Sequence, residues 1–80
     1  MRRTVTSPRH KAMVALIREA REARGLRQED VANKFGQPYM WMQRVESGER
    51  RIDVVEFCEL ANIIGFNASK AIIKLCKLRA

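Results

Sequence analysis

The sequence has little of what cross-links or bends a chain: four Gly, two Pro and two Cys in 80 residues. Cys58 and Cys76 are far apart, with neither a CxxC spacing nor a histidine beside them, which excludes the usual zinc and redox motifs. We expect both thiols to be buried as small apolar groups without a disulfide. The low Gly and Pro content, with apolar residues spaced by three and four, favours helices over strands.

Long apolar runs and catalytic motifs are also missing. No stretch approaches the roughly 18 apolar residues that span a bilayer, and the basic start MRRTVTSPRHK is not followed by the apolar segment of a signal peptide. We therefore expect a cytoplasmic protein with no membrane association. His10, the single histidine, has no Ser, Cys or carboxylate placed to form a dyad, and there is no Gly-rich phosphate loop. We expect no catalysis, no cofactor and no bound metal.

Acidic residues are outnumbered, with 9 Asp and Glu against 16 Lys and Arg, so the net charge is +7. Such a surface attracts polyanions, above all the phosphate backbone of nucleic acids. The excess is concentrated in residues 1–27, which hold eight basic residues and two acidic ones, whereas residues 28–51 hold four of each. The charge therefore indicates a polyanionic partner but does not locate the surface that recognises it.

A chain of this length forms one small domain, and we predict an all-α fold of five helices. Helix starts are marked by Ser7-Pro8, Pro38, Asp53 and Asn67, and helix ends by Gly25, Gly36, Gly48 and Gly65. The expected helices cover about 8–24, 28–35, 38–47, 53–64 and 68–80. In the fourth, the predicted inward face consists of Val54, Phe57, Leu60, Ala61 and Ile64. Residues 1–6 are expected to be a flexible basic arm, and residues 7–80 the domain.

The third expected helix, within GQPYMWMQRVESGERR, divides into two faces on a helical wheel. Met42 and Val45 face inward. The outward face holds Met40, Gln43, Arg44 and Ser47, flanked by Tyr39 and Trp41. Arg can hold guanine and Gln can hold adenine through paired hydrogen bonds, and apolar groups can touch the thymine methyl. This face therefore carries the groups that reading DNA bases requires, although an ordinary solvated face is the alternative interpretation.

Residues 27–51, RQEDVANKFGQPYMWMQRVESGERR, resemble the helix-turn-helix of the lambda-repressor and Cro-like (Xre) family of DNA-binding regulators. The matching positions are Gln28, Ala32, Gly36, Met42, Val45, Glu46 and Gly48. The resemblance covers residues 14–66 and implies a compact five-helix lambda-repressor-like domain. In that fold the second and third helices form the helix-turn-helix and the third enters the major groove. The implied function is sequence-specific regulation of transcription, most simply as a repressor.

The resemblance also implies roles by position. The base-facing residues are Tyr39, Met40, Gln43 and Arg44. The phosphate contacts are Arg27, Gln28, Trp41, Ser47, Arg50 and Arg51. Arg21 matches the arginine that pairs with the closing glutamate, here Glu46, and this pair would tie the first helix to the recognition helix; two independent surface charges are the alternative.

The two ends of the chain suggest further contacts. Arg2, Arg3, Arg9 and Lys11 lie in or beside the basic arm, which could wrap DNA or could be a solubilising tail. Ile73 and Leu78 fall outside the buried stripe of the last helix and could form a homodimer seam, or could pack against the first helix.

A different function uses the same scaffold. Met40 and Trp41 are bulkier than the small polar residues common at those places in the family, so Tyr39, Met40 and Trp41 could bind a protein instead of DNA. An antitoxin that binds a toxin and represses its own operon would combine both functions. The alternative hypothesis is therefore a protein-interaction module.

Overall fold

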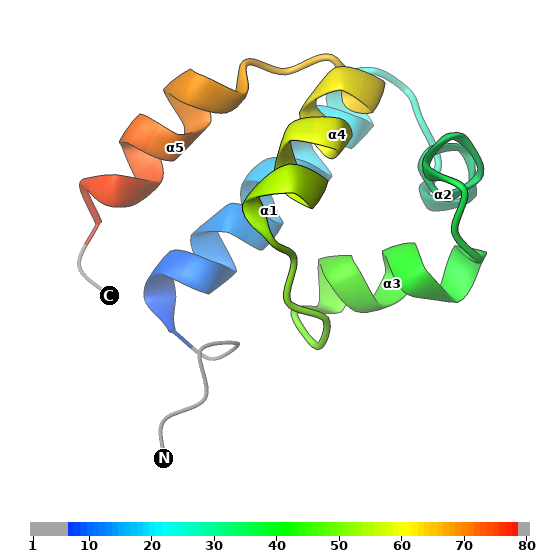
Figure 1. The fold of residues 1–80 in the computed structure, drawn as a ribbon, viewed down its shortest axis with the longest axis horizontal. Coiled ribbons are helices and arrows are strands. Elements are labelled where there is room, and N and C mark those ends of the chain that lie inside the picture. The colour runs from blue at the N-terminus through cyan, green and yellow to red at the C-terminus, as the bar shows by residue number, and fades with distance from the viewer. Residues whose placement is uncertain (1–6, 79–80) are drawn as a thin grey trace.

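The computed structural model describes residues 7–78, which form five α-helices and no β-strand. The helices are α1 (Pro8–Ala23), α2 (Gln28–Phe35), α3 (Tyr39–Ser47), α4 (Val54–Ile64) and α5 (Ala68–Cys76) (Figure 1). The predicted all-α fold is confirmed, and α5 ends earlier than expected. The predicted arm, residues 1–6, lies outside the described residues. None of the helices in the described range is both long and apolar enough to cross a bilayer.

Helix α1 lies at the centre of the arrangement and packs against α3, α4 and α5. The short helices α2 and α3 pack against each other, and α2 also packs against α4. Helix α5 packs against α1 and α4, so it lies on the opposite side of these two helices from the α2–α3 pair (Figure 1). The fold therefore presents two separate outer regions that are joined through α1 and α4.

Side-chain caps set the starts of three helices. Ser7, Asp53 and Asn67 each cap the helix that follows, because the side-chain oxygen of each accepts a hydrogen bond from the backbone N–H three residues later. At Asp53 the bond is reciprocal, since the Glu56 carboxylate accepts from the Asp53 N–H at 2.9 Å. Pro38 is the N-cap of α3, one position before the first helical turn in which it was expected.

The turn between α2 and α3 depends on a left-handed residue. Gly36 has φ of 84°, and beside it the Gln37 N–H donates to the Ala32 carbonyl at 2.9 Å, which closes the end of α2. A Cβ at this φ is unfavourable, so glycine is the residue that allows α2 to stop and α3 to leave at a steep angle.

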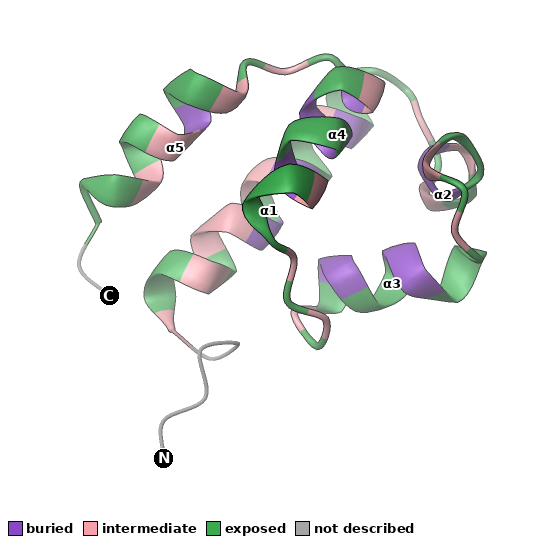
Figure 2. Ribbon diagram, viewed as in Figure 1, coloured by how far each residue is buried: buried purple, intermediate pink, exposed green. Residues whose placement is uncertain are grey.

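The core lies where α1 to α4 meet, with α5 contributing mainly Ala71. Its completely buried members include Ile17, Val31, Met42 and Leu60, one from each of the first four helices. Figure 2 shows the buried residues as stripes on the inner faces of the helices. Burying an aliphatic side chain of this size stabilises a fold by roughly 1.5–3 kcal/mol, so this contact of four helices holds α3 against the rest of the domain.

Three residues that were expected to be buried lie at the surface. Val54 is 68% exposed, and both Cys58 and Cys76 are exposed free thiols. The reason is the rotation of each helix. Cys58 follows Phe57, which is buried, so it points about 100° away from the core, and Cys76 is five residues after buried Ala71. The prediction of buried thiols was therefore wrong.

Candidate nucleic-acid interface

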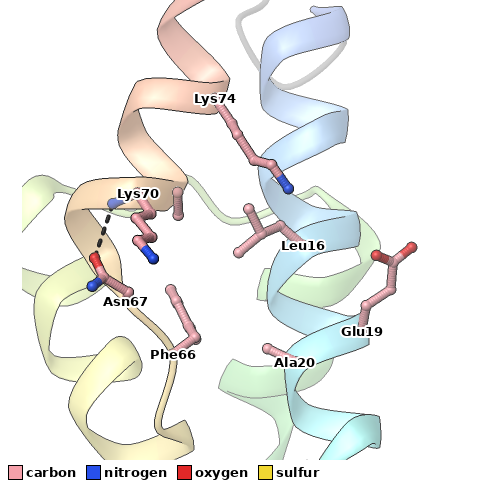
Figure 3. A pocket seen from close by; sticks show the side chains of 8 residues that line it. Leu16, Glu19, Ala20, Phe66, Asn67, Lys70 and Lys74 are labelled. Carbon is pink, nitrogen blue, oxygen red and sulfur yellow. Dashed lines mark hydrogen bonds between the residues drawn. The ribbon is translucent and has the colours of Figure 1, made fainter.

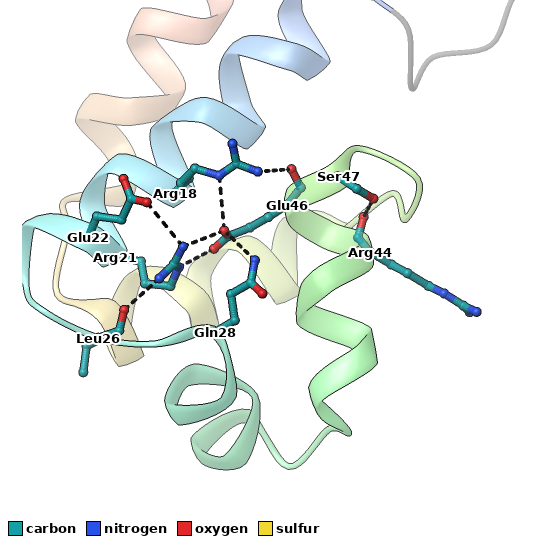
Figure 4. Close-up of polar contacts among 8 residues, drawn as sticks. All are labelled: Arg18, Arg21, Glu22, Leu26, Gln28, Arg44, Glu46 and Ser47. Atoms are coloured by element: carbon teal, nitrogen blue, oxygen red, sulfur yellow. Dashed lines mark hydrogen bonds and ion pairs between the residues drawn. The ribbon is translucent and has the colours of Figure 1, made fainter.

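One face of α3 is open to solvent while the other is part of the core. Tyr39 is 48% exposed and Met40 is 56% exposed, and Gln43 and Arg44 are exposed beside them. The buried side of the helix holds Trp41, Met42, Val45 and Glu46. In Figure 4 the Arg44 side chain extends away from α3 into open space. The base-facing residues predicted from the sequence thus share one exposed helix face.

Glu46, in the last turn of α3, is only 2% exposed and joins three helices. Arg21 of α1 donates to it twice, from Nε to Oε2 at 2.6 Å and from Nη2 to Oε1 at 2.9 Å. Gln28 of α2 donates from Nε2 to Oε1 at 3.0 Å, and Arg18 Nε lies 3.4 Å from the same oxygen (Figure 4). The carboxylate therefore fixes α3 against both α1 and α2.

The ionisation of Glu46 follows from these contacts. Burial acts to raise the pKa of its carboxyl, but the hydrogen bonds from Arg21 and Gln28 and the charge of Arg21 outweigh it, so the pKa is lowered. Arg21 also donates from Nη1 to the Leu26 carbonyl at 2.8 Å, and Arg18 donates from Nη2 to the Glu46 carbonyl at 3.0 Å. The buried charges are thus paired and hydrogen-bonded, which is the condition for a buried ion pair to be tolerated.

The two residues predicted to contact phosphate at the start of α2, Arg27 and Gln28, have partners within the protein. Gln28 is half-buried, and its side-chain amide is held by Glu46 instead of pointing outward. Arg27 is exposed, and its guanidinium lies 3.1 Å from Asp30 Oδ1 and 3.3 Å from Glu29 Oε1. Arg27 therefore faces solvent, where a phosphate could compete with these carboxylates, whereas Gln28 takes part in the support of α3.

From the last residue of α3 onward, the residues predicted to contact phosphate differ in how accessible they are. Ser47 is exposed, and its hydroxyl lies 3.1 Å from the Arg44 carbonyl and 3.0 Å from Glu49 Oε1. Arg50 donates from Nη2 to Glu56 Oε2 at 2.9 Å. Arg51 is exposed. Ser47 and Arg51 are thus the more accessible residues of this group.

Trp41 is a core residue and does not lie on the phosphate-facing surface predicted for it. It is 8% exposed, and its ring centroid lies 4.5 Å from that of Phe35, at the end of α2. Its one polar side-chain atom, Nε1, is buried and has no hydrogen-bond partner among the described residues. The Arg50 guanidinium lies 5.8 Å from the Trp41 ring centroid. The Trp41 ring therefore packs against Phe35 and lies beside the Arg50 guanidinium.

The predicted arm residues fall into two groups. Arg2 and Arg3 lie outside the described residues. Arg9 and Lys11 are exposed residues of α1, and Arg9 donates from Nε to the Leu75 carbonyl at 2.9 Å and from Nη2 to the Leu78 carbonyl. Because the C-terminal end of a helix attracts positive charge, Arg9 serves as a cap for α5. The structure thus places Arg9 in the fold and not in an arm.

Three further observations concern the remaining residues. Ile73 and Leu78, the predicted dimer seam, are both exposed, on or just after α5. Arg18 was not identified from the sequence as a partner of Glu46, although its spacing of three from Arg21 places both on one helix face. No cluster of three or more metal-ligating side chains occurs among residues 7–78.

Comparisons with known proteins agree with this geometry. The family described as "Helix-turn-helix domain" matches residues 12–70. Among solved structures, an XRE-family like protein from Pseudomonas syringae pv. tomato str. DC3000 is similar, with 36% sequence identity and a TM-score of 0.79; the match covers 84% of this chain and 82% of that chain. No curated protein matches the chain.

Proposed function

The chain belongs to the Xre-like family of helix-turn-helix DNA-binding regulators, and on this premise we propose that it binds a specific operator in double-stranded DNA and acts as a repressor. Binding across a promoter would exclude the transcription machinery without any catalytic step. A chromosomal operator would place the protein in the cytoplasm, associated with the nucleoid when bound.

The observation that carries the proposal is the division of α3 into a buried face and an exposed face. An α-helix with its side chains is about as wide as the major groove, so a helix fixed on one side by the core can insert its other side. Arg44 can bind guanine O6 and N7, and Gln43 can bind adenine N6 and N7. Met40 and Tyr39 provide apolar contacts for thymine methyl groups.

Phosphate contacts on either side of α3 would position the helix. Ser47 is exposed at the last position of α3, Arg51 is exposed beyond its end, and Arg27 is exposed just before α2. Arg50 is the fourth proposed phosphate contact. It can bind a phosphate once its guanidinium is released from Glu56. Such contacts fix the register of the protein on DNA, whereas contacts to base edges determine which sequence is bound. For Arg2, Arg3 and Lys11, contact with DNA remains a proposal based on charge.

A homodimer is the proposed binding unit. Ile73 and Leu78 are exposed apolar side chains on the α5 side of the molecule, away from α3, and pairing them with a second copy would bury both. Two recognition helices related by a two-fold axis read half-sites about 34 Å apart, one turn of DNA. The proposed operator is therefore a palindrome.

The exposure of Tyr39 and Met40 also fits a second function. Large apolar side chains at the surface are typical of protein-binding sites as well as of DNA-binding ones. In this alternative the chain is an interaction module or an antitoxin, and α3 contacts a partner protein such as a toxin.

Selection of bound sites from a random DNA duplex pool distinguishes the two functions. The selection is made near physiological salt, because a protein of charge +7 binds any duplex at low salt. We expect a palindrome with half-sites one turn apart to be enriched. Arg44→Ala should relax the selected sequence at one position per half-site, and Lys34→Ala, a change of an exposed α2 residue, should leave it unchanged. An unenriched pool would contradict operator binding and favour the protein-binding function.

A further inference from the structure

A groove of about 420 Å³ lies between α1 and α5 (Figure 3). Its floor is apolar and is formed by Leu16, Ala20, Phe66 and Ala71. Helix α5 packs against α1 and α4, so this groove lies on the other side of α1 from the α2–α3 pair (Figure 1). The groove is therefore separate from the proposed DNA-binding face.

The floor is shaped for close approach of another chain. Ala20 and Ala71 have the smallest side chains that line it, and Leu16 and Phe66 are only half-buried beside them. Small residues let a second backbone come near, while the two larger ones offer apolar surface to cover. The groove is also open to solvent, whereas sites for small molecules enclose most of the ligand. Its form therefore suits a helix better than a small molecule.

The two walls of the groove carry opposite charges. Lys70 and Lys74 are four residues apart on one face of α5, and Figure 3 shows Lys74 reaching from α5 toward α1. Glu19 lies at the outer edge of the α1 wall, and Figure 3 shows its carboxylate on the side of α1 away from α5. Within the described residues none of these three side chains takes part in a salt bridge. The α5 wall therefore offers two ammonium groups, and the α1 wall offers one carboxylate, to whatever covers the floor.

We propose that this groove docks an amphipathic helix of an acidic partner protein, with acidic side chains against Lys70 and Lys74, a basic side chain against Glu19, and apolar side chains on the floor between them. An amphipathic helix in an apolar groove is a common recognition mode, and the opposite charges of the walls set the direction of the helix. A second copy of the same groove does not fit, because two concave surfaces placed face to face leave the floor uncovered.

The position of the groove predicts simultaneous binding of partner and DNA. The docked helix contacts Leu16 and Ala20 of α1, whereas Arg18 and Arg21 hold Glu46 of α3 from another side of the same helix. The exposed face of α3 stays free. The groove would thus allow the protein to hold a partner while it is bound to the operator. Only this simultaneous binding rests on the proposed DNA-binding function; the docking itself does not.

The docking is tested with a designed peptide helix of about 14 residues, which spans about four turns. It carries Leu on one face, Glu along one edge and Lys along the other. Titrated into the isotope-labelled full chain, it should shift the NMR signals of the groove residues, among them Leu16, Phe66 and Ala71. The double variant Lys70→Glu/Lys74→Glu should bind it about tenfold or more weakly, since its carboxylates would repel the Glu edge of the peptide. Lys34→Glu, an exposed change on α2, should bind it like the wild type.

A peptide with its Glu and Lys edges exchanged completes the test, because it should prefer the double variant over the wild type. Shifts on α3, or equal affinity for wild type and double variant, would overturn the proposal. So would groove signals that shift with concentration in Ile73→Glu, a variant expected to be monomeric, because such shifts would show that a second copy occupies the groove. Binding of decanoate but not of the peptide would show a small-molecule site instead. Since no DNA is present, these outcomes are independent of operator binding.

Discussion

Arg21 and Glu46 form a bidentate ion pair between α1 and the last turn of α3, with Nε 2.6 Å from Oε2 and Nη2 2.9 Å from Oε1. Both residues are buried, although they are 25 positions apart in sequence. A bidentate guanidinium–carboxylate pair fixes the orientation as well as the distance of its partners. The direction in which α3 presents its exposed face is therefore set by α1.

Removing the charge of Glu46 should destabilise the fold strongly. Glu46→Gln leaves the buried Arg21 guanidinium with only the exposed Glu22 carboxylate, 3.8 Å away, as a counter-ion. Breaking a buried pair in this way costs about 3–5 kcal/mol. Urea unfolding followed by circular dichroism measures the difference. The control is Glu49→Gln, an exposed carboxylate just after α3, which should change the free energy of unfolding by less than about 0.5 kcal/mol. Equal stability of the wild type and Glu46→Gln would show that the ion pair contributes nothing net.

The same pair predicts a loss of stability in acid. The folded-state pKa of Glu46 is lowered, so the pair stabilises fully above the ordinary glutamate value of about 4.3, and the stabilisation is lost as pH falls through the folded pKa. Unfolding free energies measured between pH 7 and pH 2 should fall below about pH 4. The fall should be less steep in Glu46→Gln. Identical slopes in both proteins would show that the loss of stability in acid does not come from the Glu46 carboxyl.

The sequence predicted the helices well because their signals are local. Ser7, Asp53 and Asn67 cap helices through their own side chains, and Gly36 ends α2 through its own φ. The helical wheel also placed Met42 on the buried side of α3. These features need no knowledge of distant parts of the chain.

What the sequence did not predict depends on neighbours from other helices. The wheel put Trp41 at the edge of the buried side of α3, and it is Phe35 that covers it. Arg9 was assigned to an arm because the end of α5, which it caps, is far away in sequence. Likewise, Gln28 is turned toward Glu46 by the crossing of α2 and α3.

Substitution of Gly36 should test the turn of the helix-turn-helix. No atom lies within 4 Å of a Cβ added there, so the penalty of Gly36→Ala comes from φ of 84° alone. We expect a loss of about 1–2 kcal/mol in unfolding free energy. Gly36→Asn should lose less, because Asn adopts left-handed conformations more readily. If Ala and Asn were equally destabilising, the cause would be something other than the left-handed backbone.

Arg44 and Arg51 should differ in how they affect DNA binding. Arg44→Ala should reduce discrimination at one base pair by about 1–3 kcal/mol, because the guanidinium extends from the exposed face of α3. Arg51→Ala should weaken binding to all sequences alike and reduce the salt dependence by about one phosphate contact. Affinities for the selected operator and its single-base variants, measured at several salt concentrations, separate these results. A uniform loss in Arg44→Ala would assign that residue to phosphate contact.

The oligomeric state tests the proposed dimer seam. Sedimentation at micromolar concentration should show a dimer for the wild type and a monomer for Ile73→Glu, because a carboxylate in an apolar seam is unfavourable. Lys34→Glu, at an exposed position on α2, should sediment like the wild type. A monomeric wild type under these conditions would rule out the seam.

The surroundings of Trp41 make it a suitable intrinsic fluorescence probe. It is the only tryptophan in the chain, its indole packs against Phe35, and the Arg50 guanidinium lies 5.8 Å from the ring centroid. Indole emission responds to nearby charge. A phosphate that displaces Arg50 from Glu56 and from the ring should change the fluorescence of Trp41, although this side chain is buried. We therefore expect the proposed operator binding to be measurable in unlabelled protein, through the emission of a core residue.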